Sequence, residues 1–320
     1  MRYCRLDGLA KDVSLVALGT GAFGAGRGWR EAFRLLDRYA ELGGTVLDTA
    51  QVYPPSNPGE GERIIGHWLR RRGMVSRMVI STKGGHPRIA TMEQSRLSPE
   101  DLREDVMQSL ERLGVDRLGL YWLHRDDEAI PVGEILDVVF GFQEQGLIGA
   151  IGASNWSRQR LEAARAWARQ EGKPGFAASQ MGWSLAEVSG PVAYAGMLYV
   201  GEAERAYHAE TGLPLFAYSS QARGFFGPKG LAACAGDEKA RRSLAGYVSA
   251  SNRGRLERAV RLAEKKGCTP NQVALAYLLS QPWPVVAIAG CGSVAQVEDS
   301  CGAADVRIEM EAIDRLTYPT

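Results

Sequence analysis

Short apolar runs alternate along the chain with longer stretches in which apolar residues recur every three or four positions. Apolar runs of this kind are typical of strands that are buried on both faces, as in a parallel sheet. The longer stretches are typical of amphipathic helices that cover such a sheet. The apolar runs predict strands at residues 16–20, 45–50, 78–83, 118–124, 149–155, 176–181, 215–220 and 285–290.

The helical stretches carry start and stop signals. Ser98 stands before Pro99 and two acidic residues, which is the order of an N-cap, a first-turn proline and first-turn acids. Glycines stand where helix C-caps belong, at Gly43, Gly114 and Gly146. Together with the apolar pattern, these signals predict helices at Trp29–Leu42, Glu62–Arg72, Pro99–Leu113, Val132–Gln145 and Arg158–Gln170.

Eight strand candidates separated by helices predict a TIM (β/α)8 barrel. Two short segments before the first strand, Arg2–Leu6 and Asp12–Val16, predict an N-terminal β-hairpin. No change of composition divides the chain, so we expect one domain over residues 1–320. Two segments are too long to be simple connections between a strand and the next helix, namely Trp183–Gly201 and Gln221–Asn252. Because each follows a strand, we expect both to be loops over the mouth of the barrel.

Composition and charge narrow the function classes. The net charge is +1, which gives no electrostatic bias toward nucleic acid or membranes. The N-terminal sequence MRYCRLDGLAKDV has no apolar run, and no stretch of the chain is apolar over the length of a bilayer. We therefore expect a cytoplasmic protein with no membrane or nucleic-acid partner. The five scattered cysteines and four histidines form no metal-ligand motif, so we expect no metal site.

The stretch VALGTGAFGAGRGW fits a dinucleotide-binding pattern. Gly19, Gly21 and Gly24 have the spacing G-x-G-x-x-G, and Asp48 follows at about the distance of the fingerprint aspartate. In a Rossmann unit, however, the helix opens at the second glycine, whereas here the helical pattern begins only near Trp29. We interpret the glycines as allowing the loop after the first strand to pass close to a ligand at the barrel mouth.

Four ionisable side chains stand at or just after successive strand ends: Asp48, Tyr53, Lys83 and His124. In a barrel these ends meet at one mouth, where active sites are built. A tyrosine has an ordinary pKa of roughly 10, and a neighbouring ammonium lowers that pKa by favouring the phenolate. A carboxylate would hold the lysine in place, and a histidine would orient a carbonyl oxygen or shuttle its proton. Such a set would suit protonation of a developing alkoxide.

Each of these residues also has a purely structural explanation. Asp48 would cap a turn, Tyr53 would be a loop aromatic beside two prolines, and Lys83 would be a solvated charge before two glycines. His124 after an apolar run would be a core histidine. Their joint placement at consecutive strand ends favours a shared site over four unrelated roles.

At these residues the chain resembles the aldo-keto reductase family over nearly its whole length. The motifs that carry the resemblance are LDTAQVY followed by GEGERIIGHWL, then STK, LSPEDLREDVMQSLERLGVDRLGLYWLH, IGASNWS, LFAYSSQARGFFG and AIAGCGSVAQVEDS. The short tail after the eighth strand is similar to that of bacterial members. The resemblance implies a TIM barrel that binds NAD(P)H without a Rossmann domain. It also implies that Tyr53 is the general acid, that Lys83 paired with Asp48 tunes its pKa, and that His124 positions the carbonyl.

The resemblance further implies which residues bind the cofactor. Gly21 would lie near the nicotinamide, Tyr218 would stack under its ring, and the carboxamide would be held by Ser154, Asn155 and Gln180. The pyrophosphate would lie along Ser219, Gln221 and Gly224, and closer to these residues than to Gly19–Gly24. The adenosine end would be surrounded by Gly290, Ser293, Gln296, Asp299 and Ser300.

One departure from the family concerns the 2′-phosphate of NADPH. The family often places lysine or arginine there, but the residues Cys291, Gly292, Ser293 and Gln296 provide no basic side chain. Ser293 and Arg223 remain as candidate phosphate contacts. We expect NADP(H) as the cofactor, with NAD(H) as the alternative.

Substrate contacts are expected from aromatic and charged residues near the strand ends, namely Phe23, Trp29, Arg125, Trp156 and Trp183. Arg125 and the two aspartates after it would offer hydrogen bonds to a sugar or polyol, or else form a solvated turn. The tryptophans would form the pocket wall or belong to the core.

The leading hypothesis is an enzyme that reduces a small aldehyde or ketone, sugar-like or polyol-like carbonyls included, to an alcohol with Tyr53 as the general acid. One alternative is a non-enzymatic regulatory subunit of the same fold that binds a nicotinamide nucleotide. Another is a barrel aldolase that forms a Schiff base on Lys83, which pairing with Asp48 disfavours. The sequence specifies neither the physiological substrate nor the oligomeric state.

Overall fold

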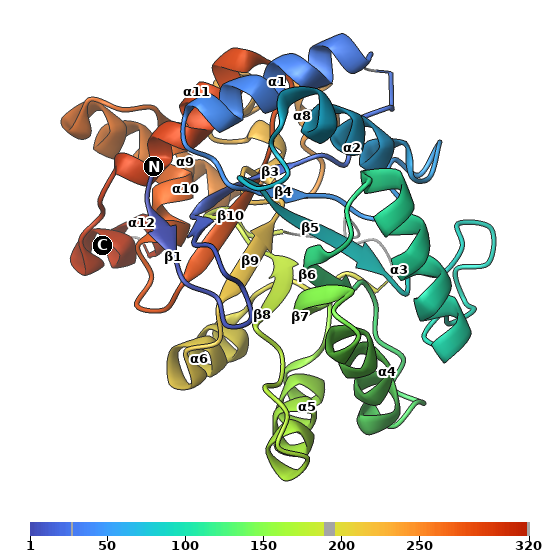
Figure 1. Cartoon of the computed structure of the whole chain (residues 1–320). Coiled ribbons are helices and arrows are strands. Elements are labelled where there is room, and N and C mark those ends of the chain that lie inside the picture. The colour runs from blue at the N-terminus through green and yellow to red at the C-terminus, as the bar shows by residue number, and fades with distance from the viewer. Residues whose placement is uncertain (27, 189–195, 319–320) are drawn as a thin grey trace.

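Eight parallel strands close into a barrel with helices around the outside, as Figure 1 shows. The computed structural model describes residues 1–26, 28–188 and 196–318. Neighbouring strands pair in the order β10-β3-β4-β5-β6-β7-β8-β9, with β9 returning to β10. The strands are β3 (Val16–Gly19), β4 (Val46–Asp48), β5 (Val79–Gly84), β6 (Leu118–Leu123), β7 (Ile148–Ser154), β8 (Ala178–Gly182), β9 (Leu215–Tyr218) and β10 (Val285–Gly290). The prediction of a TIM barrel is therefore confirmed.

The helices begin and end close to the predicted residues. Ser98 accepts a hydrogen bond from the backbone N–H of Asp101 at 3.1 Å, so the predicted N-cap is confirmed. Over the described residues, no helix has both the length and the apolar character needed to cross a membrane. The helices are α1 (Trp29–Glu41), α2 (Glu60–Arg72), α3 (Pro99–Leu113), α4 (Val132–Glu144), α5 (Arg158–Gln170), α6 (Glu202–Thr211), η1 (Ala222–Gly224), α7 (Pro228–Cys234), α8 (Glu238–Ser243), α9 (Ala250–Lys266), α10 (Pro270–Leu279), α11 (Val294–Gly302), η2 (Ala303–Asp305) and α12 (Met310–Thr317).

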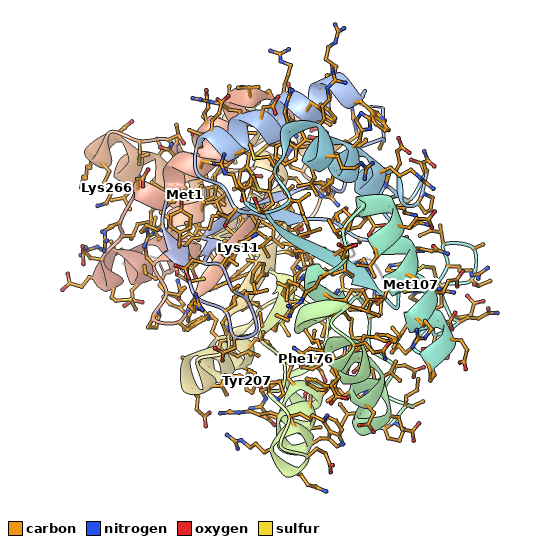
Figure 2. All side chains as sticks on the ribbon, in the orientation of Figure 1. Met1, Lys11, Met107, Phe176, Tyr207 and Lys266 are labelled. Carbon is orange, nitrogen blue, oxygen red and sulfur yellow. The ribbon has the colours of Figure 1, made fainter. Side chains whose placement is uncertain are left out.

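The predicted N-terminal hairpin is present and closes one end of the barrel. Its strands, β1 (Tyr3–Cys4) and β2 (Val13–Ser14), are shorter than predicted and pair antiparallel. Three apolar residues of this segment, Leu6, Leu9 and Val13, pack against the side chains inside the barrel. Lys11 lies over this end, where its ammonium donates to the carbonyl of Met78 at 3.3 Å (Figure 2). The hairpin thus leaves the opposite end, at the carboxyl termini of the strands, as the open mouth.

The interior of the barrel is filled by every second residue of the strands, because successive strand side chains point to opposite faces. The inward-facing apolar side chains are Ala17, Val46, Val79, Leu120, Trp122, Ala150, Ala178, Phe216, Val286 and Ile288. Outward-facing residues pack against the surrounding helices in a second core. Two or four residues after an inward-facing residue, toward the carboxyl end of the strand, the side chain again points to the inside of the barrel. The residues at these positions, which lie at the mouth, are Asp48, Lys83, His124, Gln180 and Tyr218.

The expectation that Gln221–Asn252 is a loop is wrong. This segment contains η1, α7, α8 and the first residues of α9. Phe225 and Phe226 within it are fully buried, so the segment is anchored by apolar packing. In Trp183–Gly201, residues 189–195 lie outside the described residues. Tyr199 forms a parallel β-bridge with Gly182, which ties the later part of that segment to the barrel.

Candidate active site

Four side chains that the sequence predicts to act together lie together at the barrel mouth. The Nζ of Lys83 is 2.7 Å from Oδ2 of Asp48 and 5.2 Å from the centre of the Tyr53 ring. The rings of Tyr53 and His124 meet edge to face, with their centroids 5.8 Å apart. A phenol, an ammonium and an imidazole therefore converge on one point of the mouth.

The carboxylate of Asp48 is held by three donors. Its Oδ1 accepts hydrogen bonds from Ser81 Oγ at 2.9 Å and from Gln180 Nε2 at 3.1 Å, while Oδ2 accepts from Lys83. Lys83 is 1% exposed and Asp48 is 4% exposed, so the two charges are shielded from water. Charge-assisted bonds in a buried setting are short and directional. The pair therefore fixes a positive charge beside the phenol of Tyr53.

The imidazole of His124 is 5% exposed and sits beside a second histidine, His86, at a ring distance of 4.7 Å. Burial lowers the pKa of His124 well below its ordinary value, and the charges of His86, Lys83 and Arg125 lower it further. His124 is therefore neutral near pH 7. Its Nδ1 is buried with no hydrogen-bond partner among the described residues, which favours the tautomer that carries the proton on Nε2.

The buried histidines make the stability of the protein dependent on pH. Burial lowers the pKa of His86, His124 and His208, so the unfolded chain binds more protons than the folded protein once the pH falls to about 6.5. We expect the free energy of unfolding to fall as the pH decreases from 7.5 to 5.5. In the His124→Gln variant this loss should be smaller by about 1 kcal/mol, as measured by urea denaturation at both pH values.

A matched control for this experiment is His67→Gln. His67 lies on the outside of the barrel, where its ring packs between Trp29 and Phe33. We expect this variant to show the wild-type loss of stability between the two pH values. An unchanged pH dependence in His124→Gln would contradict the assignment of His124 as a buried neutral imidazole.

A groove with a volume of about 860 Å³ leads from Asp48 and Tyr53 across the barrel mouth. At the Tyr53 end it passes Gly21, where an added Cβ would lie 3.7 Å from the Tyr53 ring. The predicted residues that line the groove are Gly21, Phe23, Asp48, Tyr53, Gln180, Tyr218, Ser219, Gln221, Gly224, Gly290, Gln296 and Asp299. The groove therefore connects the ionisable group to most of the residues predicted to bind a nucleotide.

Tyr218 and the two residues at the end of β7 form one hydrogen-bonded unit beside the groove. The hydroxyl of Tyr218 lies 2.6 Å from Oδ1 of Asn155 and 2.9 Å from the carbonyl oxygen of Leu198. The amide of Asn155 donates to Ser154 Oγ at 3.1 Å and to the carbonyl of His124 at 3.3 Å. Asn155 has a left-handed backbone with φ of 59°, which this network holds in place. The ring of Tyr218 is thereby fixed against the groove.

At the far end, the groove is lined by Gln221 and Gln296, whereas the predicted residues Ser293 and Ser300 lie outside the lining and bind these two side chains or their backbone. Gln221 donates to Ser300 Oγ at 3.1 Å. Ser293 caps α11 by accepting from the N–H of Gln296, whose own side chain accepts from the N–H of Gly292 at 2.5 Å. Two backbone amides at the start of α11, those of Gly292 and Gln296, are thus already engaged.

Asp299 also lies at this end, and its carboxylate is held by two side chains. It accepts from Thr269 Oγ1 at 2.6 Å and from Asn271 Nδ2 at 2.7 Å. The basic residues that line the groove come from the segment after β9 instead. They are Arg223 and Lys229. Positive charge is therefore available along the middle of the groove, next to Ser219 and Gln221.

The structure does not bring the three predicted tryptophans to the mouth. Trp29 lies on the outer helix α1, is 40% exposed and donates to Glu60 at 2.9 Å. Trp156 is fully buried and packs edge-on against Phe176. Trp183 is 6% exposed and stacks on Trp283 at a centroid distance of 6.1 Å. These side chains serve packing, so they are corrected from substrate contacts to structural residues.

Three residues of the site were not predicted, namely Ser81, Trp122 and His86. Trp122 donates to Ser81 Oγ at 2.7 Å, and Ser81 in turn donates to Asp48, so a chain of bonds orients the carboxylate. Strand alternation would have revealed both residues. Ser81 lies two positions before Lys83, and Trp122 lies two before His124. His86 follows the strand in a loop, and no periodic signal marks it.

The fold and the site together define the class of protein to which the chain belongs. The chain is a (β/α)8 barrel with a buried lysine–aspartate pair, a tyrosine and a neutral histidine at the mouth, beside a long polar groove. The family model described as Aldo/keto reductase family matches residues 15–318. The chain belongs to this family, and that membership supports an oxidoreductase function.

Similar sequences and a solved structure agree with this assignment. The chain is 30% identical to the uncharacterized oxidoreductase YrpG of Bacillus subtilis over 322 residues, covering 99% of this chain and 95% of that protein. It is 31% identical to the uncharacterized oxidoreductase Rv2298 of Mycobacterium tuberculosis over 332 residues, covering 99% and 92%. The crystal structure of an aldo-keto reductase from Klebsiella pneumoniae in complex with NADPH has a similar fold. Its TM-score is 0.72 at 23% identity, covering 100% of this chain and 97% of that one.

Proposed function

We propose that the protein reduces an aldehyde or a ketone to the alcohol with a reduced nicotinamide cofactor. The observation that carries the proposal is the buried Lys83–Asp48 pair, 5.2 Å from the ring of Tyr53 and next to a neutral His124. This arrangement suits an acid that protonates a carbonyl oxygen as negative charge develops on it. Family membership supports the use of a nicotinamide cofactor.

The groove fits such a cofactor. Its Tyr53 end is lined by Gly21, Gln180 and Tyr218, which offer a close backbone, an amide and an aromatic ring. Added Cβ atoms at Gly224 and Gly290 would meet nothing within 4 Å, so the groove is open at these positions. The nicotinamide would lie at the Tyr53 end, and the pyrophosphate near Arg223 and Ser219. When bound, the cofactor supplies a hydride to the carbonyl carbon.

The chain's own residues would then handle the proton. The hydroxyl of Tyr53 gives its proton to the carbonyl oxygen as the C–O bond becomes that of an alcohol. The ammonium of Lys83 stabilises the phenolate that remains, and Asp48 keeps that ammonium charged and in place. His124, neutral and with its proton on Nε2, is suited to donate a hydrogen bond to the same oxygen. The buried positions of Asp48, Lys83 and His124 keep competing water away from the charges.

The proposal is tested by steady-state kinetics of the purified protein with NADPH and with NADH against a panel of aldehydes, ketoses and steroids. We expect oxidation of the reduced cofactor that depends on the carbonyl compound. Tight cofactor binding without turnover of any carbonyl, together with a stable protein partner, would instead favour a non-enzymatic regulatory subunit. Borohydride trapping of substrate on Lys83 without any nicotinamide would favour an aldolase.

The choice between NADPH and NADH is expected to depend on the start of α11. Replacing Gly292 by arginine puts a cation where related proteins often carry one for the 2′-phosphate. We expect the Kd for NADPH to fall by about tenfold, as for a single charge-assisted contact, and the Kd for NADH to stay the same. Fluorescence titration of the two cofactors measures both values.

A distant variant separates a specific contact from a general charge effect. Ala166 is exposed on α5, on the outside of the barrel, and Ala166→Arg adds the same charge there. We expect this variant to bind both cofactors like the wild type. An equal gain for NADPH and NADH in Gly292→Arg would show that the arginine does not meet the 2′-phosphate.

A further inference from the structure

Arg125, the residue after His124, forms no ion pair with a carboxylate among the described residues, although it lines a hollow together with Glu93, Asp126, Asp127 and Glu128. Its Nη1 donates to the backbone carbonyl of His124 at 3.1 Å, and its Nε is buried without a hydrogen-bond partner among the described residues. Burial lowers the pKa of Arg125, and the groups acting against this effect are the hydroxyls of Tyr218 and Tyr53. The segment 189–195, SGPVAYA, holds no acidic residue that would supply a counter-ion.

Other arginines of the fold that are withdrawn from water have carboxylate partners. Arg96, which is 7% exposed, pairs with Asp105 at 2.6 Å and with Asp101 at 2.6 Å. Arg160 makes two bonds of 2.7 and 2.9 Å to Asp126. Withdrawing an arginine from water costs free energy that a partner normally offsets. Among the described residues, Arg125 has no such carboxylate partner, and its Nε makes no hydrogen bond.

The two aspartates after Arg125 do not serve this purpose. Asp126 is taken up by Arg160, and Oδ1 of Asp127 accepts the N–H of Ala129 at 3.0 Å. The sequence alone suggested that the three residues 125–127 would bind a polyol together. The structure separates their roles, because the aspartates stabilise the turn while Arg125 forms no ion pair among the described residues.

The guanidinium of Arg125 lies beside the reacting groups. Its Nη1 donates to the carbonyl of His124 at 3.1 Å, and the same carbonyl accepts from Nδ2 of Asn155 at 3.3 Å. Asn155 in turn accepts from the hydroxyl of Tyr218. The backbone of Arg125 is fixed, since Trp156 Nε1 donates to the Arg125 carbonyl at 3.3 Å. Unlike Arg223 and Lys229, Arg125 does not line the groove assigned to the cofactor, so its partner is not the pyrophosphate.

We propose that the carbonyl substrate carries an anionic group, a carboxylate or a phosphate, and that Arg125 binds this group while Tyr53 and His124 meet the carbonyl oxygen. A guanidinium suits this task because its fork of donors matches the oxygens of both anions. The inference rests on the proposed function, since it assigns the substrate class of the same site. It narrows that class from any aldehyde or ketone to those with a negative charge near the carbonyl.

The test compares matched pairs of carbonyl compounds that differ in charge. One pair is 4-formylbenzoate and its methyl ester, and the other is glyceraldehyde 3-phosphate and glyceraldehyde. We expect the wild type to prefer the charged member of at least one pair, and which pair it prefers distinguishes a carboxylate from a phosphate. Arg125→Gln should lower kcat/KM for that charged member by about 10- to 100-fold, mainly through KM, because a bond to a charged group is lost.

Three controls make the result decisive. Arg125→Lys should recover part of the lost kcat/KM, because it keeps the charge but not the fork of donors. Arg30→Gln, on the exposed surface of α1, removes the same charge far from the mouth and should change nothing. Turnover of the neutral member by Arg125→Gln at close to the wild-type rate shows that the variant is folded.

The outcomes separate the two proposals. Equal losses for charged and neutral members in Arg125→Gln, or no loss for either, would overturn the anionic substrate and leave carbonyl reduction standing. So would a wild type that prefers the neutral member of both pairs. Absence of turnover for every carbonyl compound, with the cofactor bound, would overturn the proposed function and the inference with it.

Discussion

Replacing Tyr53 by phenylalanine is expected to lower kcat for carbonyl reduction by about 10²- to 10⁴-fold, the range that a positioned acid contributes. Phenylalanine keeps the ring that packs near Gly21 and meets His124 edge to face. It lacks only the hydroxyl that gives up the proton. We therefore expect the loss in kcat with an unchanged Kd for the cofactor, measured by stopped-flow kinetics and by fluorescence titration.

The control for this prediction is Tyr3→Phe. Tyr3 is 47% exposed on the hairpin at the opposite end of the barrel, where its hydroxyl donates to the carbonyl of Gly43 at 2.9 Å. Loss of that hydroxyl should leave kcat and cofactor binding as in the wild type. A Tyr53→Phe variant that retains wild-type kcat would rule out the phenol as the acid and redirect attention to His124.

Most of the barrel is predictable from the sequence because strand burial and helix capping are local signals. The strand that ends at Asp48 appears as a continuous apolar run. The start of the helix after Ser98 is marked by four successive residues, Ser98 to Asp101. The segment Gln221–Asn252 was not predictable in the same way. Its helices α7 and α8 are short, so they offer too few turns for a periodic pattern.

The meeting of the four ionisable side chains at the mouth is predictable from the sequence for a related reason. Parallel strands in a barrel all end at one edge, so residues at strand ends far apart in the chain must converge. Strand alternation then gives the direction, and Lys83 and His124 fall on the inward face. The wall of the substrate pocket has no such rule. Trp156 and Trp183 follow strand ends just as Tyr53 does, yet they turn into the core, because large aromatics gain most from full burial.

The interactions around Arg125 show what sequence cannot supply. The sequence predicts that the run Arg125-Asp126-Asp127 either binds a polyol or forms a solvated turn. Only the structure shows that Asp126 is bound to Arg160, a residue of α5, and is therefore lost to its neighbour. Pairing between charges on different elements depends on side-chain geometry, which no spacing along the chain encodes.

Replacing Lys83 by methionine is expected to damage both stability and catalysis. The change leaves the carboxylate of Asp48 buried without its counter-ion, which costs about 3–5 kcal/mol in free energy of unfolding. It also removes the cation that stabilises the phenolate of Tyr53, so kcat should fall by about 10²-fold or more. Urea denaturation and steady-state kinetics measure the two losses.

The double variant Lys83→Met/Asp48→Asn separates the two effects. With both charges gone, the neutral amide at position 48 keeps its hydrogen bonding with Ser81 and Gln180, so most of the stability should return. The catalytic loss should remain, because no cation stands beside Tyr53. Lys173→Met, which breaks an exposed pair with Glu144, should cost less than about 1 kcal/mol and leave kcat unchanged. Recovery of kcat together with stability in the double variant would mean that Lys83 only holds the fold, and that the acidity of Tyr53 is set by other groups at the mouth.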